Sequence, residues 1–277
     1  MRFGVHLPNF GPLGDPRLLA DLAAEAESAG WNGFFVWDHI LGDPLWREPM
    51  VDPWIALGAV AAATSEIRLG ALVTAVPRRR PWHLARETTT LDHLSGGRLV
   101  VGVGLGFPAS AEFEHFGEDG DRLRRARLLD EGLAILAGLW SGEPFAFDGD
   151  EYHVRETVFV PTPVQRPRPP VWVAAHWPNR APLRRAARWD GVFPEHADGG
   201  RLTPAELTEL LDYVRQHRDA ADPFDAVIAG KSADVTPTEL ADYADAGMTW
   251  WLESIRPGET LTDVRQRIAA GPPRSGA

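Results

Sequence analysis

The feature that most constrains this fold is a regular alternation of short apolar runs with longer helical runs. Eight apolar or β-branched runs predict strands, and each is followed by a stretch with helical spacing of its apolar residues. Strand followed by helix, repeated eight times, is typical of a parallel sheet with helical crossovers. Eight such units favour a closed α/β barrel, the (β/α)8 or TIM barrel, over an open sheet. The predicted strands are Arg2–Leu7, Gly33–Trp37, Ile67–Val73, Leu99–Val103, Val171–Ala175, Gly191–Phe193, Ala226–Ala229 and Thr249–Leu252.

The helical runs carry start and stop signals of their own. Proline stands at or near the start of most of them, where its missing N–H costs nothing. The sequences "TPAE" (Thr203–Glu206) and "TPTE" (Thr236–Glu239) predict capping boxes, and the Gly96-Gly97 pair predicts a helix end. The predicted helices are Pro16–Ala29, Pro53–Thr64, Pro81–Ser95, Asp121–Trp140, Pro182–Trp189, Pro204–Asp219, Pro237–Ala246 and Leu261–Ala269.

One insertion interrupts the pattern between strands four and five. Residues Ser141–Pro170 contain "FAFDGDEYHV", which predicts a hairpin around Asp148-Gly149, and then the stiff connector "PTPVQRPRPP". We expect this insertion to lie over the mouth of the barrel as a wall or lid. Residues 1–270 are expected to form a single barrel domain, and residues 271–277 a flexible tail.

Composition excludes several classes of function. The formal charge of −11, from 28 basic and 39 acidic residues, argues against nucleic-acid binding, and no apolar stretch is long enough to span a membrane. The start "MRFGVHLPNF" lacks the long apolar stretch of a secretory signal and predicts a first strand instead. Cysteine is absent, which excludes disulfides and thiol catalysis and fits a cytoplasmic enzyme. The nine histidines show no metal-binding spacing, so no metal site is predicted.

Two local features have more than one interpretation. The run Arg78–Arg80 is either a solvated loop or a contact to an anionic group. Eleven tryptophans are many, and some are expected in the core while others line a site for a flat or apolar ligand. The tryptophans expected near the barrel mouth, each with core packing as the alternative, are Trp37, Trp46, Trp177 and Trp82.

An acid and a histidine end the second predicted strand, in "FFVWDHI" (Phe34–Ile40). Residues just past the C-terminal end of a barrel strand point to the active-site face. His39 can donate or accept a hydrogen bond near neutral pH, and Asp38 can orient a loop or hold His39 in one tautomer. The alternative is that the pair only ends the strand and caps nearby backbone.

Other strand ends add weaker signals. Strand four ends in "VGVGLG", where Gly102, Gly104 and Gly106 either let a flat ligand approach or only form a tight strand end. Strand five ends in "AAHWPNRAP" before a helix, and this is either an anion site or a connecting turn. There is no G-x-S-x-G elbow of a serine hydrolase, whereas a carboxylate pair for glycoside cleavage stays open because acids are plentiful.

Four segments together resemble the bacterial luciferase-like flavin monooxygenases and their deazaflavin-dependent relatives. The resemblance runs from Met1 to about Arg256, and Leu69–Gly106 is its most specific part. The segments are "WDHI", "LGALVTAVPRRRPWHLARETTTLDHLSGGRLVVGVGLG", "PPVWVAAHWPNRAPLRRAARWDGVFP" and "AGMTWWLES".

The resemblance implies a barrel with a flavin or deazaflavin across its C-terminal mouth. It implies a non-proline cis peptide at Ala71-Leu72 that supports the ring system, and catalytic roles for His39 and Asp38. The segment from Ala175 to Arg180 matches the one that takes the phosphate arm. The residues implied in cofactor binding are Asn9, Ala71, Leu72, Thr74, Gly104, Gly106, Ala175, His176, Trp177, Asn179 and Arg180.

The cofactor stays open between FMN and a deazaflavin coenzyme of the F-420 type. The acid-histidine pair resembles the deazaflavin branch, whereas the bulky "AHWPN" departs from the small turn of many deazaflavin enzymes. Expected partners are a small, apolar or aromatic organic substrate, a second copy of the chain in a homodimer, and a separate flavin reductase. The open alternatives are a non-catalytic flavin-binding protein on the same barrel and an unrelated barrel hydrolase.

Overall fold

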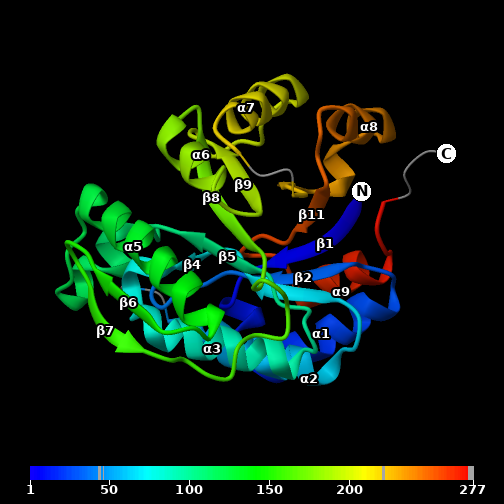
Figure 1. Ribbon diagram of the computed structural model, residues 1–277. Helices are drawn as coiled ribbons and strands as arrows, with labels where there is room; N and C mark the ends of the chain where they lie inside the picture. Colours follow the sequence, from blue (N-terminus) through cyan, green and yellow to red (C-terminus); the bar gives the residue numbers. More distant parts are fainter. Residues whose placement is uncertain (43–44, 46, 220–221, 274–277) are drawn as a thin grey trace.

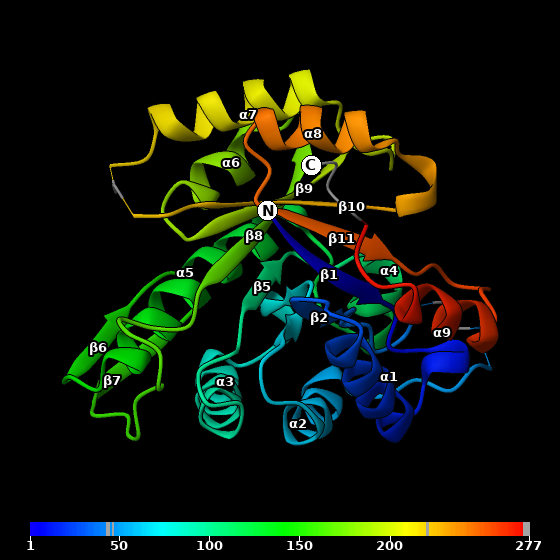
Figure 2. The same ribbon diagram turned by 90° about the vertical axis from the view of Figure 1, so that its right-hand side faces the viewer.

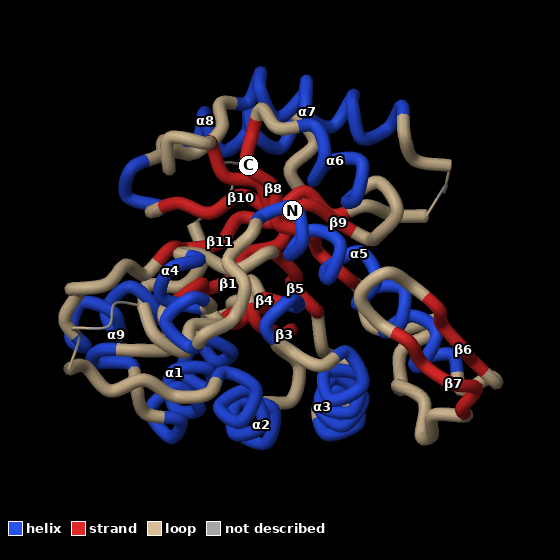
Figure 3. The backbone as a smooth tube through the Cα atoms, turned by 90° about the vertical axis from the view of Figure 1, so that its left-hand side faces the viewer, coloured by secondary structure: helices blue, strands red, loops and turns tan. Residues whose placement is uncertain are grey.

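Nine strands of a computed structural model form one parallel sheet that curls toward closure, with helices around it (Figures 1 and 3). The structure describes residues 1–42, 45, 47–219 and 222–273. The sheet order is β3-β2-β1-β11-β10-β9-β8-β5-β4. A parallel bridge joins Leu69 of β3 to Leu99, just before β5. It links the third of the eight predicted strands to the fourth and so completes the ring. The barrel strands are β1 (Arg2–Leu7), β2 (Gly33–Val36), β3 (Arg68–Ala71), β4 (Thr74–Ala75), β5 (Val101–Gly104), β8 (Val171–Trp177), β9 (Gly191–His196), β10 (Asp225–Gly230) and β11 (Trp250–Ser254).

The predicted fold and its eight helices are confirmed. Thr203 and Thr236 each form a full capping box, and Asp15 caps the first helix by accepting from Arg17 N at 2.8 Å. The helices that follow the strands are α1 (Pro16–Ser28), α2 (Pro53–Ala63), α3 (Pro81–Leu94), α5 (Arg122–Ser141), α6 (Arg180–Ala186), α7 (Pro204–Gln216), α8 (Pro237–Asp245) and α9 (Leu261–Ala269). Short additions are α4 (Ala109–Glu112) and the 3-10 turns η1 (Gly11–Leu13), η2 (Val76–Arg78), η3 (Glu114–Phe116) and η4 (Ser232–Asp234).

The third predicted strand is broken in two. Residues Ile67–Val73 were expected to be continuous, but β3 ends at Ala71 and β4 begins at Thr74. A non-proline cis peptide joins Leu72 to Val73 between them. The predicted position, Ala71-Leu72, was therefore wrong by one residue.

The hairpin was predicted correctly, but its place was not. The strands β6 (Phe145–Asp148) and β7 (His153–Thr157) pair antiparallel. They lie on the outer side of α5, away from the barrel axis (Figure 2). Glu131 of α5 accepts from the backbone N–H groups of the hairpin turn, and the connector continues along α3, where Asp92 accepts from Val164 N at 2.7 Å. The expectation of a lid over the mouth was wrong because these contacts fasten the insertion to the helical layer.

Aromatic side chains fill the barrel interior. Phe35, Trp172 and Trp250 are buried and contact one another with ring centroids 5.4 to 5.8 Å apart. Such pairs add about 0.5–1.5 kcal/mol each beyond the burial of area. Trp140 and Trp251 are also fully buried, so part of the tryptophan content serves the core, as expected. The packed interior leaves the C-terminal ends of the strands as the place for a site.

Candidate functional site at the C-terminal mouth of the barrel

His6, near the end of β1, forms the floor of the mouth. Its Nε2 lies 2.9 Å from the carbonyl oxygen of Leu72, and its ring lies against Trp37 and Phe193. A carbonyl only accepts, so Nε2 carries the proton and Nδ1 is left as an acceptor. Burial lowers the pKa of His6 to about 4 against the effect of the Leu72 hydrogen bond, and the charge of Arg256 lowers it further. His6 is therefore neutral near pH 7.

Asn9 holds the segment that carries the predicted catalytic pair. Its Nδ2 donates to the carbonyl oxygens of His39 at 2.8 Å and Val51 at 2.7 Å, and its Oδ1 accepts from His39 N at 3.3 Å. Asn9 is fully buried, and its amide is used by these bonds. The structure thus places Asn9 beside His39, where it fixes backbone rather than exposing a polar group to the mouth.

His39 is joined to a carboxylate that sequence reasoning missed. Its Nδ1 lies 2.9 Å from Oε1 of Glu112, whose side chain is 1% exposed, and Ile40 N and Leu41 N also donate to Glu112 at 3.3 Å. Burial alone would raise the pKa of Glu112, but the hydrogen bond from His39 and the charge of Arg78 outweigh it and lower that pKa. An ionised Glu112 accepts a hydrogen bond from the protonated Nδ1 of His39, so Nε2 is the nitrogen free for chemistry.

Two arginines of the Arg78–Arg80 run lie largely buried against Asp38, and one of them also reaches Glu112. Arg78 pairs with both Asp38 and Glu112, and Arg79 Nη2 lies 3.2 Å from both carboxylate oxygens of Asp38. Of the three arginines, only Arg80 is exposed. The interpretation of the run as a solvated loop therefore holds for Arg80 but not for Arg78 and Arg79. Asp38 is 5% exposed and points to the arginines. Asp38 and His39 thus belong to one network, but the link runs through Arg78 and Glu112.

Two glycines at and after the end of β5, the fourth predicted strand, are packed closely against neighbouring side chains. A Cβ on Gly104 would lie 2.8 Å from a methyl of Val73, and one on Gly106, whose φ is +84°, would lie 2.8 Å from the ring of Phe113. Close packing of protein therefore explains these glycines. Ala71 and Leu72 are buried in the barrel wall and interior, and Thr74 is buried with its Oγ1 unpartnered. Their predicted contacts with a cofactor stay predictions.

The side chains at the end of β8, the fifth predicted strand, point to two opposite faces of the sheet. Ala175 and Trp177 are buried in the outer layer, and His176, on the opposite face, is exposed and lies 4.0 Å from Glu195. Asn179 is exposed, and its side chain does not cap α6. Arg180 stacks on Trp177 and pairs with Glu209 at 2.6 Å. The structure does not bring these side chains together as one phosphate site, and their predicted role is untested.

The other tryptophans expected at the mouth separate in the same way. Trp37 lies 5.8 Å from the rings of both His6 and His39, and its Nε1 is buried without a partner. Trp82 packs on Tyr152 of the hairpin, and Trp46 lies outside the described residues.

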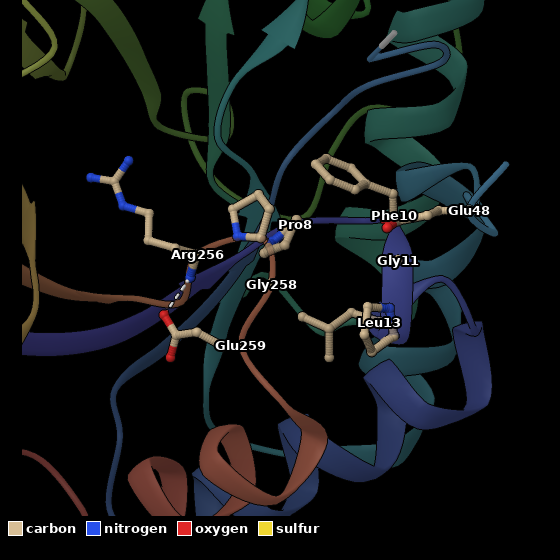
Figure 4. A pocket seen from close by; sticks show the side chains of 10 residues that line it. Pro8, Phe10, Gly11, Leu13, Glu48, Arg256, Gly258 and Glu259 are labelled. Atoms are coloured by element: carbon tan, nitrogen blue, oxygen red, sulfur yellow. Dashed lines mark hydrogen bonds between the residues drawn. The ribbon is translucent and has the colours of Figure 1, made fainter. Parts of the chain in front are cut away.

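A small pocket opens beside the end of β1 (Figure 4). Pro8, Phe10 and Leu13 line one side, and Arg256 and Glu259 line the other. Its volume is about 10 Å³, which is room for about one water molecule and not for a cofactor ring. No described residues form a group of three metal-ligand side chains, and no described helix is long and apolar enough to cross a membrane.

The missed residues left little trace in the sequence. Glu112 stands in "ASAEF", an apolar stretch after a barrel strand, and an acid in such a place is the one available sign. His6 stands within an apolar strand near its C-terminal end, which was an equivalent sign.

Comparison with known proteins assigns the sequence to a family. The family model for luciferase-like monooxygenase covers residues 1–270. An uncharacterised protein of Mycobacterium tuberculosis is 32% identical over 274 residues, which cover 91% of this chain and 92% of that protein.

Solved structures share the fold at low identity. An F420-dependent secondary alcohol dehydrogenase in complex with an F420-acetone adduct superposes with a TM-score of 0.78 at 17% identity, covering 97% of this chain and 96% of that one. A monooxygenase from Streptomyces bottropensis superposes with a TM-score of 0.78 at 22% identity and the same coverage.

Proposed function

Because this chain belongs to the luciferase-like monooxygenase family and is an oxidoreductase by that membership, we propose that it binds a reduced flavin or deazaflavin at the barrel mouth. Its substrate in this proposal is a small organic molecule of apolar or aromatic character. One similar structure is an F420-dependent alcohol dehydrogenase, and another, a type II Baeyer-Villiger monooxygenase, is in complex with FMN, which supports both cofactor classes.

Three unpartnered buried polar atoms, in residues at or just past the C-terminal ends of β1, β2 and β3, support the proposal. They are Nδ1 of His6, Nε1 of Trp37 and Oγ1 of Thr74. Leaving such an atom unpaired costs about 1–3 kcal/mol, so a ligand that pairs with it recovers that free energy. The pyrimidine edge of a flavin or deazaflavin presents carbonyl acceptors and an N–H donor. Donors from Trp37 and Thr74 and an acceptor on His6 fit that edge.

In this proposal the cofactor would supply the electrons, and residues of this chain would handle the proton. When bound, the reduced ring supplies two electrons, either for oxygenation with molecular oxygen or as a hydride exchanged with a substrate carbon. His39 Nε2 would hold or move a proton at the substrate, and Glu112 would keep the other ring nitrogen protonated. Glu112 and Asn9 keep His39 at the mouth.

Exposed apolar side chains on the rim support the apolar substrate. Phe107, just past β5, is 76% exposed, and Phe116 is 54% exposed. Ile40, directly after His39, is 41% exposed. Exposed apolar side chains in the segments that follow barrel strands can serve ligand or protein contacts.

The first test is a binding titration followed through tryptophan fluorescence. FMN and an F420-type deazaflavin, each oxidised and anaerobically reduced, are added to the apo protein. Preference for reduced FMN predicts oxygen consumption with substrate, and preference for the deazaflavin predicts oxygen-independent hydride transfer. Binding of neither would contradict the proposal. Tight binding with neither activity across a broad substrate panel would favour the non-catalytic alternative, and hydrolysis without a cofactor would favour the barrel hydrolase.

The proposal extends to partners and location. We expect a homodimer in the cytoplasm, and a separate flavin reductase where FMN is the cofactor. Light scattering after size-exclusion chromatography tests the dimer.

A further inference from the structure

Arg78 joins two buried carboxylates that come from distant parts of the chain. Its Nη2 contacts Oδ1 of Asp38 and lies 3.1 Å from the carbonyl oxygen of Asp38, and its Nη1 contacts Oε2 of Glu112. The side chain is 6% exposed, so water competes little for these contacts. A guanidinium is a planar fork whose nitrogens can face two acceptors at once, and the ammonium of a lysine cannot match this.

Glu112 is the only described carboxylate that contacts both Arg78 and His39. Oε2 of Glu112 receives Arg78, and Oε1 lies 2.9 Å from Nδ1 of His39. The position of the guanidinium therefore decides the orientation of the carboxylate that His39 meets. Asp38 lies at the far end of this chain of contacts and holds the guanidinium rather than the imidazole.

Arg78 also balances the negative charge of the carboxylate that contacts His39. Arg79 shares its charge among Asp38, Asp52 at 3.7 Å and Glu87 at 3.6 Å. Arg78 is therefore the described arginine that pairs with the carboxylate against His39, whereas the charge of Arg79 goes to Asp38, Asp52 and Glu87. The rings of Phe10 and Trp37 also lie against His39. Removing one guanidinium would leave the imidazole facing a more negative surrounding.

We propose that Arg78 is a positioning residue for His39: by bridging Asp38 to Glu112, it sets the carboxylate against Nδ1 and directs Nε2 of His39 to the barrel mouth. This role rests on the proposed function for its purpose in catalysis. The arrangement itself is a property of the apo protein and is measured without any cofactor. Asp38 acts in the same arrangement as the anchor of Arg78.

The test follows the ring nitrogens of His39 by NMR in protein labelled with 15N-histidine. His39→Gln identifies the His39 signals among the nine histidines. In the unmodified protein the expected neutral form carries its proton on Nδ1. Arg78→Met removes the group that orients Glu112, and we expect the neutral form of His39 to lose its preference for the Nδ1 proton, so that the form protonated on Nε2 becomes populated. Arg80→Ala is the matched control, since Arg80 is exposed and its side chain has no carboxylate contact in the described structure.

A merely structural role predicts a different pattern. Arg78→Met would then lower thermal stability while a folded sample keeps the tautomer of His39 seen with Arg80→Ala, and that result would overturn the proposal. If Arg78→Met does not fold, Arg78→Lys serves instead, because it keeps the charge but cannot span both carboxylates. We expect turnover in Arg78→Lys to fall by about tenfold with cofactor Kd unchanged.

Unchanged turnover in Arg78→Lys would also overturn the proposal. Failure of the unmodified protein to bind either cofactor would contradict the proposed function alone, since the tautomer of His39 measured by NMR still reports on Arg78.

Discussion

Nε2 of His6 lies 2.9 Å from the carbonyl oxygen of Leu72, at the cis peptide bond between Leu72 and Val73. This contact ties the end of β1 to the break between β3 and β4, across the floor of the mouth. It also fixes the tautomer of His6, because a carbonyl requires a donor. A protonated His6 would bury a charge, and the lowered pKa of about 4 expresses that cost.

The first prediction is that His6 makes stability fall in mild acid. The folded pKa of His6, about 4, lies below the ordinary value of 6.5, so between these values the unfolded chain binds a proton that the folded chain does not. The stability from neutral His6 is present above pH 6.5 and is lost as the pH falls toward 4. We expect the free energy of unfolding to drop by about 2 kcal/mol between pH 7 and about pH 5 through His6 alone.

Urea denaturation at both pH values measures this loss. His6→Phe should remove most of it, because phenylalanine occupies similar space and does not titrate. His83→Gln, which changes an exposed histidine of α3, should keep the full loss. Equal pH dependence in His6→Phe and the unmodified protein would show that His6 is not the responsible group.

The second prediction concerns His39. His39→Ala should lower turnover by about 100-fold and leave cofactor Kd nearly unchanged, because its role is proton handling rather than binding. Steady-state kinetics and the fluorescence titration measure the two quantities on the same sample. Turnover equal to that of the unmodified protein would remove His39 from the mechanism.

The third prediction uses two glycines with opposite surroundings. A Cβ on Gly102 would lie 2.4 Å from the carbonyl oxygen of Ala71 and 2.3 Å from a methyl of Leu72. Gly102→Ala should therefore destabilise the protein by about 3 kcal/mol. A Cβ on Gly58 in α2 would meet nothing within 4 Å, and Gly58→Ala should stabilise by about 0.5–1 kcal/mol. Urea denaturation compares them, and equal effects would show that the clash at Gly102 is relieved by movement.

The eight strand-helix units were predictable because their signals are local. Prolines, capping residues and apolar spacing act within a few residues, and Thr203 and Thr236 cap their helices as their motifs predict. The isomer of a peptide bond leaves no such spacing signal. The run "LGALVTA" therefore read as one strand although the backbone divides it at Leu72-Val73.

The site was predictable only in part, because its contacts join distant segments. Asp38 and His39 could be placed at the mouth from strand position alone, but Glu112 follows them by more than 70 residues and lies in a four-residue helix without a side-chain N-cap. The resemblance implies one phosphate-binding segment from Ala175 to Arg180, whereas the alternation along the strand turns Trp177 to the outer layer. Contacts in three dimensions decide the first case, and the second follows from the period of two along a strand.

The last prediction separates a binding tryptophan from a packing tryptophan. Nε1 of Trp37 is a buried donor without a partner beside His6 and His39, so it is available to a bound ring. Trp37→Phe keeps an aromatic ring but removes the donor, and we expect cofactor Kd to rise by about tenfold, the equivalent of one hydrogen bond. Trp82→Phe is the control, because Trp82 packs on Tyr152 of the outer hairpin. If both variants bind the cofactor as tightly as the unmodified protein, Nε1 of Trp37 does not donate to the ring, and the polar edge must be met by Thr74 and His6 alone.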